Sequence, residues 1–177
     1  MTHLIFDTET TGLLPALGAR MKHQARIIEW GGLLVDKEGK ELGELNVLIN
    51  PGMPLPAVIT KITGITDKDL VDQPSFPEAA PRIREMFEKA DVLVAHNLPF
   101  DKSMMELDLR RAGLLEGWPW PKRLVCTVQE HVEAWGHRPK LVELYEFYFG
   151  KPLAQTHRAI DDARALKEVC VAAGVLR

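Results

Sequence analysis

The chain has 177 residues, of which 46% are hydrophobic and 27% are charged, as in ordinary folded globular proteins. No apolar run approaches the ~20 residues of a membrane-spanning helix, so we expect no membrane segment. The length fits a single domain over residues 1–177. The formal net charge of -3 excludes the strong positive field of a protein that scans DNA by charge alone, so a site for a polyanion must be local or supplied by metal ions.

The first residues run directly into a strand-like pattern and lack the basic and apolar regions of a secretory signal, which predicts a cytoplasmic protein. Two cysteines are present, Cys126 and Cys170, and we expect both to be buried free thiols.

The first part of the chain predicts three antiparallel strands. Strand-like runs cover residues 3–8, 26–36 and 42–50, with a turn at residues 37–40 between the last two. After Pro51, proline and glycine residues separate short helical pieces.

From residue 76 onward, predicted helices alternate with predicted strands. The helices cover residues 76–89, 100–112, a segment after 127, 141–149 and 158–173, and the strands cover 91–95 and 124–127. This order predicts an α/β fold with a mixed central sheet, in which three antiparallel strands come first.

Two acidic residues stand close together in the first strand. Side chains on a strand alternate between faces, so Asp7 and Glu9 point the same way if the strand continues through them. Neighbouring carboxylates in a partly buried place repel each other unless a cation lies between them, and divalent cations prefer oxygen ligands. The alternative is a polar strand end without chemistry.

A third acidic residue, Asp101, follows the predicted strand 91–95 and a short polar turn, near the start of the next helix. A carboxylate there is also favoured by the helix dipole, so a purely structural role stays open. His96, in the turn, is equally compatible with a structural role.

The last helix separates two adjacent acids. Its apolar positions include Ala159, Ala163 and Leu166, and Asp162 lies at the edge of this stripe, facing the protein body. Asp161 lies on the polar face and is expected to be a solvated, ion-paired residue. His157 comes at or just before the first turn, with Thr156 as a candidate cap, and a lone histidine at this place is more often structural.

These segments resemble the three motifs of the DEDDh 3′ to 5′ exonucleases, the family that includes the proofreading subunit of bacterial DNA polymerase III. The motif segments are Asp7-x-Glu9-Thr-Thr-Gly-Leu, Ala95-His96-Asn97-x-x-Phe100-Asp101 and His157-Arg-Ala-Ile-Asp-Asp162-Ala163, and the segment from Ile49 to Asp67 is also similar. The resemblance spans nearly the whole chain. It implies a ribonuclease-H-like fold and hydrolysis of single-stranded or frayed DNA from the 3′ end, with release of nucleoside 5′-monophosphates. A 3′ to 5′ RNA exonuclease is a close alternative.

The resemblance also implies a role for each motif residue. Asp7, Glu9, Asp101 and Asp162 would hold two Mg²⁺ or Mn²⁺ ions about 3.5 to 4 Å apart. Asp7 would bridge both ions, Glu9 and Asp162 would complete the site that carries the attacking water, and Asp101 would support the second ion through water. His157 would be the general base, which suits an imidazole with a reference pKa of about 6.5.

Substrate contacts are implied for Thr8, Thr10, Ile62 and Asn97. Family members often have histidine where Thr63 stands, so the contact made by that side chain is in question. Two further segments are open to either interpretation. The basic loop around Arg20, Lys22 and Arg26 is either a phosphate contact or a solvated loop, and the tryptophan-rich segments 118–123 and 135–140 either stack on bases or pack at the edge of the core.

The expected partner is therefore a nucleic acid with a single-stranded 3′ end, and a polymerase or repair protein is a further candidate partner. The sequence does not predict the oligomeric state. A non-catalytic nucleic-acid-binding module on the same fold, or an adaptor with a fortuitous acidic cluster, are the alternatives from other functional classes.

Overall fold

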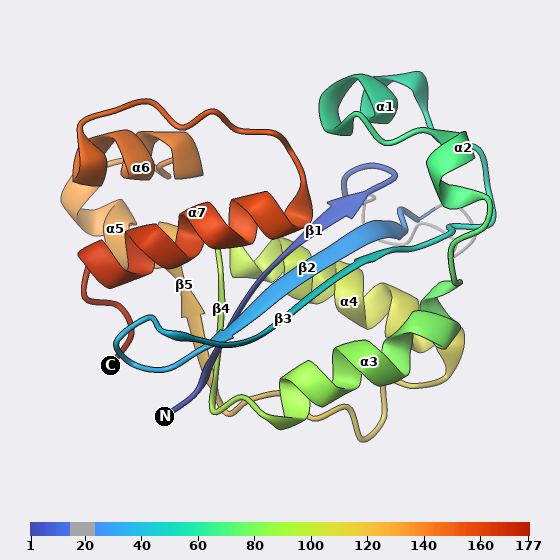
Figure 1. Ribbon diagram of the computed structural model, residues 1–177, viewed down its shortest axis with the longest axis horizontal. Helices are drawn as coiled ribbons and strands as arrows, with labels where there is room; N and C mark the ends of the chain where they lie inside the picture. The colour runs from blue at the N-terminus through green and yellow to red at the C-terminus, as the bar shows by residue number, and fades with distance from the viewer. Residues whose placement is uncertain (15–23) are drawn as a thin grey trace.

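A computed structural model describes residues 1–14 and 24–177, and in this part of the chain a five-stranded sheet lies between layers of helices (Figure 1). The strands are β1 (His3–Thr10), β2 (Ile27–Val35), β3 (Glu41–Leu48), β4 (Val92–Ala95) and β5 (Arg123–Cys126), in the order β3-β2-β1-β4-β5. Strand β2 pairs antiparallel with both β1 and β3, and β4 pairs parallel with both β1 and β5. The predicted mixed sheet that begins with three antiparallel strands is confirmed.

The helices of the described residues occupy the positions that the sequence predicts. They are α1 (Ala57–Thr63), α2 (Asp67–Leu70), α3 (Phe76–Glu88), α4 (Leu98–Ala112), α5 (Thr127–Trp135), α6 (Leu141–Phe149) and α7 (Ala159–Ala172). Helix α4 begins two residues earlier than predicted, because Pro99 occupies its first turn, where a missing N–H costs no hydrogen bond. None of the described helices is both long enough and apolar enough to cross a membrane.

Each face of the sheet has its own core. Leu4 and Phe6 of β1 belong to the core shared with α3 and α4, which also contains Phe87 and Met104. Ile5, between them in the sequence, belongs to the core shared with α6 and α7. Because alternation continues along β1, Asp7 and Glu9 are directed to the α7 face. Figure 1 shows α7 lying across this face, near the end of β1.

Strand β2 is buried along its whole length, as expected for a strand that helices cover on both faces. The two cysteines are buried and unpaired, which confirms the prediction made from their number. One core is built around aromatic contacts, and the ring centroids of Phe6 and Trp30 lie 6.0 Å apart.

Candidate active site

The carboxylates Asp7 and Glu9 lie on one face of β1, as predicted, because the strand continues through both residues to Thr10. The pairing of β1 with β4 ends at Ile5 and Val94. Asp7 and Glu9 therefore lie beyond the carboxyl end of β4, at the place where the chain turns into α4.

Asp101 comes to this edge of the sheet from the first turn of α4. Its side chain is buried, and Oδ1 accepts hydrogen bonds from the Thr8 N–H (3.1 Å) and the Thr8 hydroxyl (2.7 Å). Asn97, the residue before the helix, has a φ of 63°, a left-handed conformation that non-glycine residues rarely adopt. This turn and the Thr8 contacts hold the first turn of α4 against the end of β1.

Helix α7 presents Asp162 inward and Asp161 outward, which confirms the prediction from helical periodicity. Asp162 is buried, whereas Asp161 is half exposed and pairs with Arg164 at 3.4 Å. Thr156, the candidate cap, does not cap this helix. The N-cap residue is Arg158, and the Thr156 hydroxyl instead donates to Asp161 at 2.9 Å.

His157 lies immediately before the N-cap of α7 and has a φ of 51°. His157 and Asn97 are the only non-glycine residues of the described chain with positive φ, and they precede the two helices that carry Asp162 and Asp101. Unusual backbone conformations are most often retained where a side chain has to be held in a particular direction.

The first turn of α7 lies directly on β2 at Gly31. A Cβ atom at Gly31 would lie 2.4 Å from the Ile160 nitrogen and 2.6 Å from the Ala159 carbonyl carbon, so no other residue fits without moving the helix. The missing side chain lets α7 approach the sheet closely. This approach brings Asp162 to the carboxylates of β1.

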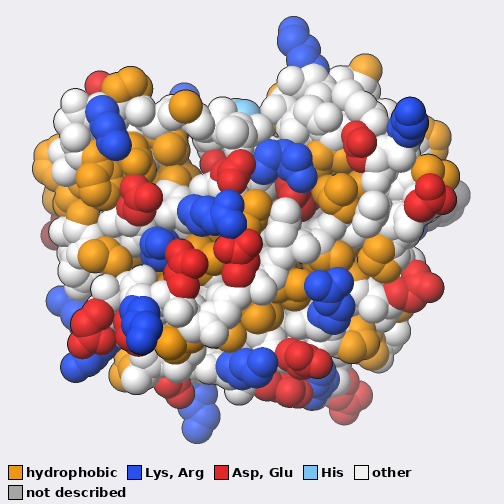
Figure 2. Space-filling view, viewed as in Figure 1, with side chains coloured by type: hydrophobic (Ala, Val, Ile, Leu, Met, Phe, Trp, Pro, Cys, Tyr) orange, Lys and Arg blue, Asp and Glu red, His pale blue; other side chains and the backbone are white. Residues whose placement is uncertain are grey.

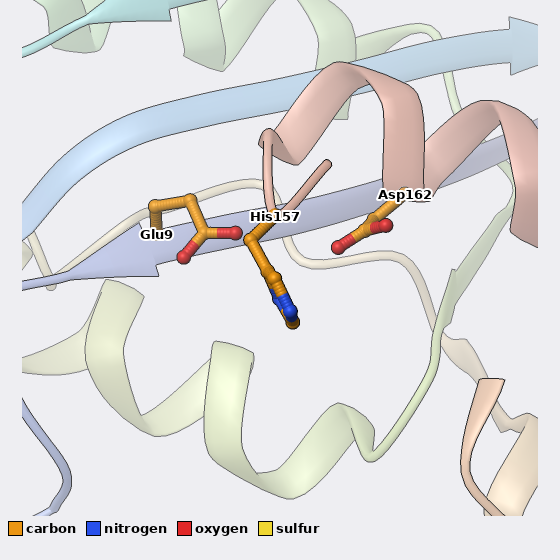
Figure 3. Close-up of side chains that lie close together, drawn as sticks. All are labelled: Glu9, His157 and Asp162. Atoms are coloured by element: carbon orange, nitrogen blue, oxygen red, sulfur yellow. The ribbon is translucent and has the colours of Figure 1, made fainter. Parts of the chain in front are cut away.

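Three of the predicted site residues form a compact group. Glu9, His157 and Asp162 each place a candidate ligand atom within 4.8 Å of the other two. Figure 3 shows Glu9 on β1 and Asp162 on α7, with the His157 side chain between them. This arrangement could hold a metal ion, and its carboxylate oxygens suit Mg²⁺ or Mn²⁺.

The four predicted metal-binding carboxylates also influence one another electrostatically. Burial raises the pKa of Asp7 well above its usual value, and Asp101, Glu9 and Asp162 raise it further. Burial and the charge of Asp162 raise the pKa of Glu9 to about 8. Burial also raises the pKa of Asp101 to about 7 and the pKa of Asp162 above its usual value. A bound cation would relieve this repulsion, so the residues fit an oxygen-ligated divalent metal.

The four residues expected at the substrate lie in different environments. Thr8 is buried against Asp101, and the buried Thr10 donates its hydroxyl hydrogen bond to the Gly12 carbonyl at 2.7 Å. Ile62 on α1 is 48% exposed, so its side chain is available to a ligand. Asn97 accepts a hydrogen bond from Arg138 through Oδ1.

Thr63, which stands where family members often have histidine, is buried. Its hydroxyl donates to the Ile59 carbonyl at 2.9 Å and accepts from the Ile65 N–H at 3.1 Å. Both bonds lie within α1 and the turn after it, so this side chain stabilises the turn.

The basic loop and the tryptophans are only partly explained by the structure. Arg20 and Lys22 lie outside the described residues, and Arg26 donates to the Pro51 carbonyl at 2.9 Å. Trp118 and Trp120 pack edge-on against Phe87, at centroid distances of 5.5 and 5.3 Å, which is the core-edge packing considered from the sequence.

The profile of one protein family matches residues 4–170, and the description of that family is Exonuclease (RNase T type). The chain belongs to this exonuclease family. It is 34% identical over 167 residues to DNA polymerase III subunit epsilon of Treponema pallidum, covering 93% of this chain and 72% of that protein. It is 33% identical over 174 residues to the PolC-type DNA polymerase III of Caldanaerobacter subterraneus subsp. tengcongensis, covering 95% of this chain but only 11% of that protein.

Solved structures agree with the assignment of the fold to the ribonuclease-H-like exonucleases. Exonuclease X in complex with 5′ overhanging duplex DNA has a TM-score of 0.66 at 23% identity, covering 97% of this chain and 93% of that chain. The nuclease domain of 3′hExo, a DEDDh family member bound to rAMP, has a TM-score of 0.73 at 16% identity, covering 96% of this chain and 90% of that chain. At these identities the likeness establishes the fold.

One residue of this exonuclease-family chain that sequence reasoning missed is Glu29 on β2. Its buried carboxylate accepts hydrogen bonds from Arg158 Nε (2.9 Å) and Nη2 (2.8 Å), the Ala159 N–H (3.0 Å) and Asn46 Nδ2 (3.1 Å). Glu29 thus holds the first turn of α7 on the sheet. The available signal was a single acid within an otherwise apolar strand, a place where a charge needs a partner.

Proposed function

We propose that this chain is a metal-dependent 3′ to 5′ exonuclease that removes nucleoside 5′-monophosphates from single-stranded or frayed DNA, with residues 1–177 acting as one exonuclease domain. The observation that carries the proposal is the group of four partly or fully buried acids, Asp7, Glu9, Asp101 and Asp162, with His157 beside them. Burying carboxylates without a counter-charge destabilises a fold. A bound cation would reduce the repulsion among these four acids and so stabilise the folded protein.

In this proposal each side chain has a defined task. Asp7, Glu9, Asp101 and Asp162 would hold two Mg²⁺ or Mn²⁺ ions, and the bound ions would supply activation of water and stabilisation of the leaving oxygen. Thr8 fixes the Asp101 carboxylate through its two hydrogen bonds. His157 takes the proton from the attacking water through a ring nitrogen, and the Glu29 contacts keep the start of α7 in place.

DNA is the first choice of substrate because the two relatives described above, at 33% and 34% identity, are named as DNA polymerase III proteins. A polymerase or a repair protein is accordingly the proposed protein partner, and the cytoplasm the proposed location. RNA is the second candidate, because the 3′hExo nuclease domain with bound rAMP shares the fold.

The deciding experiment follows 5′-labelled single-stranded DNA and the matching RNA with Mg²⁺ or Mn²⁺. The wild-type protein should shorten the strand from the 3′ end, and the relative rates on the two strands should show which sugar is preferred. Asp162→Asn should abolish shortening. Asp161→Asn is the matched control, because Asp161 is the adjacent acid but lies on the outer face of α7. This variant should retain activity. Tight binding without cleavage of either strand would favour a non-catalytic binding module.

A further inference from the structure

A pocket of about 360 Å³ adjoins the acidic site, between the start of α4 and the start of α6. Its lining includes Asn97, Arg138, Lys140 and Gln155. Gln155 Nε2 donates a hydrogen bond to Asp162 Oδ2 at 3.0 Å, so the pocket and the acidic group share a wall. Figure 2 shows a notch in the outline of this face, between the lobe that carries α6 and the lobe that carries α1.

The pocket carries two cationic side chains, Arg138 and Lys140, that form no ion pair with a carboxylate of the described residues. Arg138 Nη2 donates to Asn97 Oδ1 at 2.7 Å, and this acceptor is a neutral amide. Arg158, the cation at the start of α7, is instead paired with Glu29 at 2.8 Å. In the part of the chain that the structure describes, Arg138 and Lys140 of this pocket are therefore basic groups that remain available to a ligand beside the acids.

The backbone adds to this positive potential. Helix α6 begins at Leu141, which lines the pocket with Val142, and α4 has its N-cap at Asn97. The N-terminal end of a helix carries partial positive charge and N–H groups without intrahelical acceptors. The Glu143 carboxylate, which accepts from the Lys140 N–H at 2.6 Å, offsets part of this field.

His96 holds the segment Arg138-Pro139-Lys140 in place. Its Nδ1 lies 2.9 Å from Thr127 Oγ1, and the ring also hydrogen-bonds the backbone of Pro139. Since proline has no N–H, the ring is the donor in that second bond. Burial lowers the pKa of His96 to about 4, so the ring is neutral near pH 7 and contributes position rather than charge. Arg138 and Lys140, on either side of Pro139, are thereby fixed beside the site.

We propose that this pocket binds a phosphate group of the nucleic-acid strand whose 3′ end lies at the acidic site, with Arg138 as the principal cation and Lys140 as the second. The proposal rests on the proposed function for the nature of the occupant. It also explains how a chain with a net charge of -3 and a cluster of acids retains a polyanion, because the compensating cations lie immediately beside that cluster.

The test measures binding without hydrolysis. A 5′-fluorescein-labelled single-stranded oligonucleotide is titrated in chelator over a series of salt concentrations, by fluorescence anisotropy. Arg138→Gln should weaken affinity roughly tenfold, the value expected for one lost charge-assisted hydrogen bond. It should also reduce the slope of log affinity against log salt by ~0.7, the contribution of one phosphate contact on a single strand.

Three further variants separate charge from structure. Arg138→Lys should keep the salt slope, and Lys140→Gln should reduce it without touching the contact between Arg138 and Asn97. Arg82→Gln, at an exposed arginine of α3, is the matched control and should change neither affinity nor slope.

Competition with a nucleoside 5′-monophosphate distinguishes a phosphate of the strand from the phosphate of the product. Arg138→Gln should weaken binding of the strand more than binding of the monophosphate, and equal losses would overturn the assignment to the strand. An unchanged salt slope in both Arg138→Gln and Lys140→Gln would overturn the pocket itself. Salt-sensitive binding through Arg138 in a wild-type protein that does not cleave would support the pocket and contradict only the exonuclease proposal.

Discussion

The contact between Glu29 and Arg158 should stabilise the protein far more than a similar contact at the surface. Glu29→Ala removes a carboxylate that is buried completely, and leaves the Ala159 N–H without its acceptor. Breaking a buried ion pair from one side costs roughly 3–5 kcal/mol. Because the Arg158 side chain is 38% exposed and can be rehydrated, we expect a loss of about 3 kcal/mol, at the low end of that range.

The chain contains a matched control for this prediction. Arg164 of α7 also binds both carboxylate oxygens of a glutamate, Glu44 of β3, through Nη2 at 2.9 and 2.8 Å, but both side chains are exposed, at 46% and 38%. Exposed pairs of this kind contribute roughly 0–1 kcal/mol, so Glu44→Ala should have only a small effect.

Urea unfolding, followed by circular dichroism, would measure the free energy of unfolding of each variant, and thermal unfolding would measure its Tm. For a domain of this size a loss of 3 kcal/mol corresponds to a decrease in Tm of roughly 6–12 °C for Glu29→Ala, against less than about 4 °C for Glu44→Ala. Glu29→Gln, which keeps an acceptor but removes the charge, should fall between them. Equal destabilisation by Glu29→Ala and Glu44→Ala would refute the view that the buried contact anchors α7.

Three other predictions concern the acidic site. Mg²⁺ or Mn²⁺ should raise the Tm of the wild-type protein, as measured by calorimetry. In chelator, Asp7→Asn should melt at a higher temperature than wild type, because one repelling charge is gone. A Tm that does not change with metal would argue against a metal site. Without metal, the free energy of unfolding should fall as pH rises from about 5 to about 8. The reason is that the folded-state pKa values of Glu9 (about 8) and Asp101 (about 7) lie above those of the unfolded chain, so the folded state binds more protons in this window. A free energy of unfolding that does not change with pH in chelator would contradict this prediction. His157→Ala should lose most turnover while Mn²⁺ binding, followed by titration calorimetry, is retained, and unimpaired hydrolysis would exclude His157 as the general base.

Local sequence patterns predicted the elements because each pattern reflects local geometry. The period of two placed Asp7 and Glu9 on one face of a strand, and the period of 3.6 separated Asp162 from Asp161, as the burial of these residues confirms. The boundaries of α6 agree with the prediction, and those of the other elements differ by a few residues. The candidate cap Thr156 does not cap α7, because a hydroxyl near a helix start can bond to a side chain instead of the backbone.

Contacts between distant residues could not be predicted in this way. Glu29 meets Arg158 across 129 positions of the chain, and Thr8 meets Asp101 across 93. Nothing in the sequence near Arg138 indicates that it reaches Asn97, or that the starts of α4 and α6 enclose a pocket.

Spacing along the chain was enough to predict the order and type of the elements, the three motif segments and the direction of each acid on its own strand or helix, because these features are local. Three features became visible only in the folded chain: β4 lies beside β1, Gly31 lets α7 approach the surface of the sheet, and Glu29 holds α7 there. Those features depend on which surfaces pack together, and packing joins residues whose separation in the sequence carries no information about their distance in space.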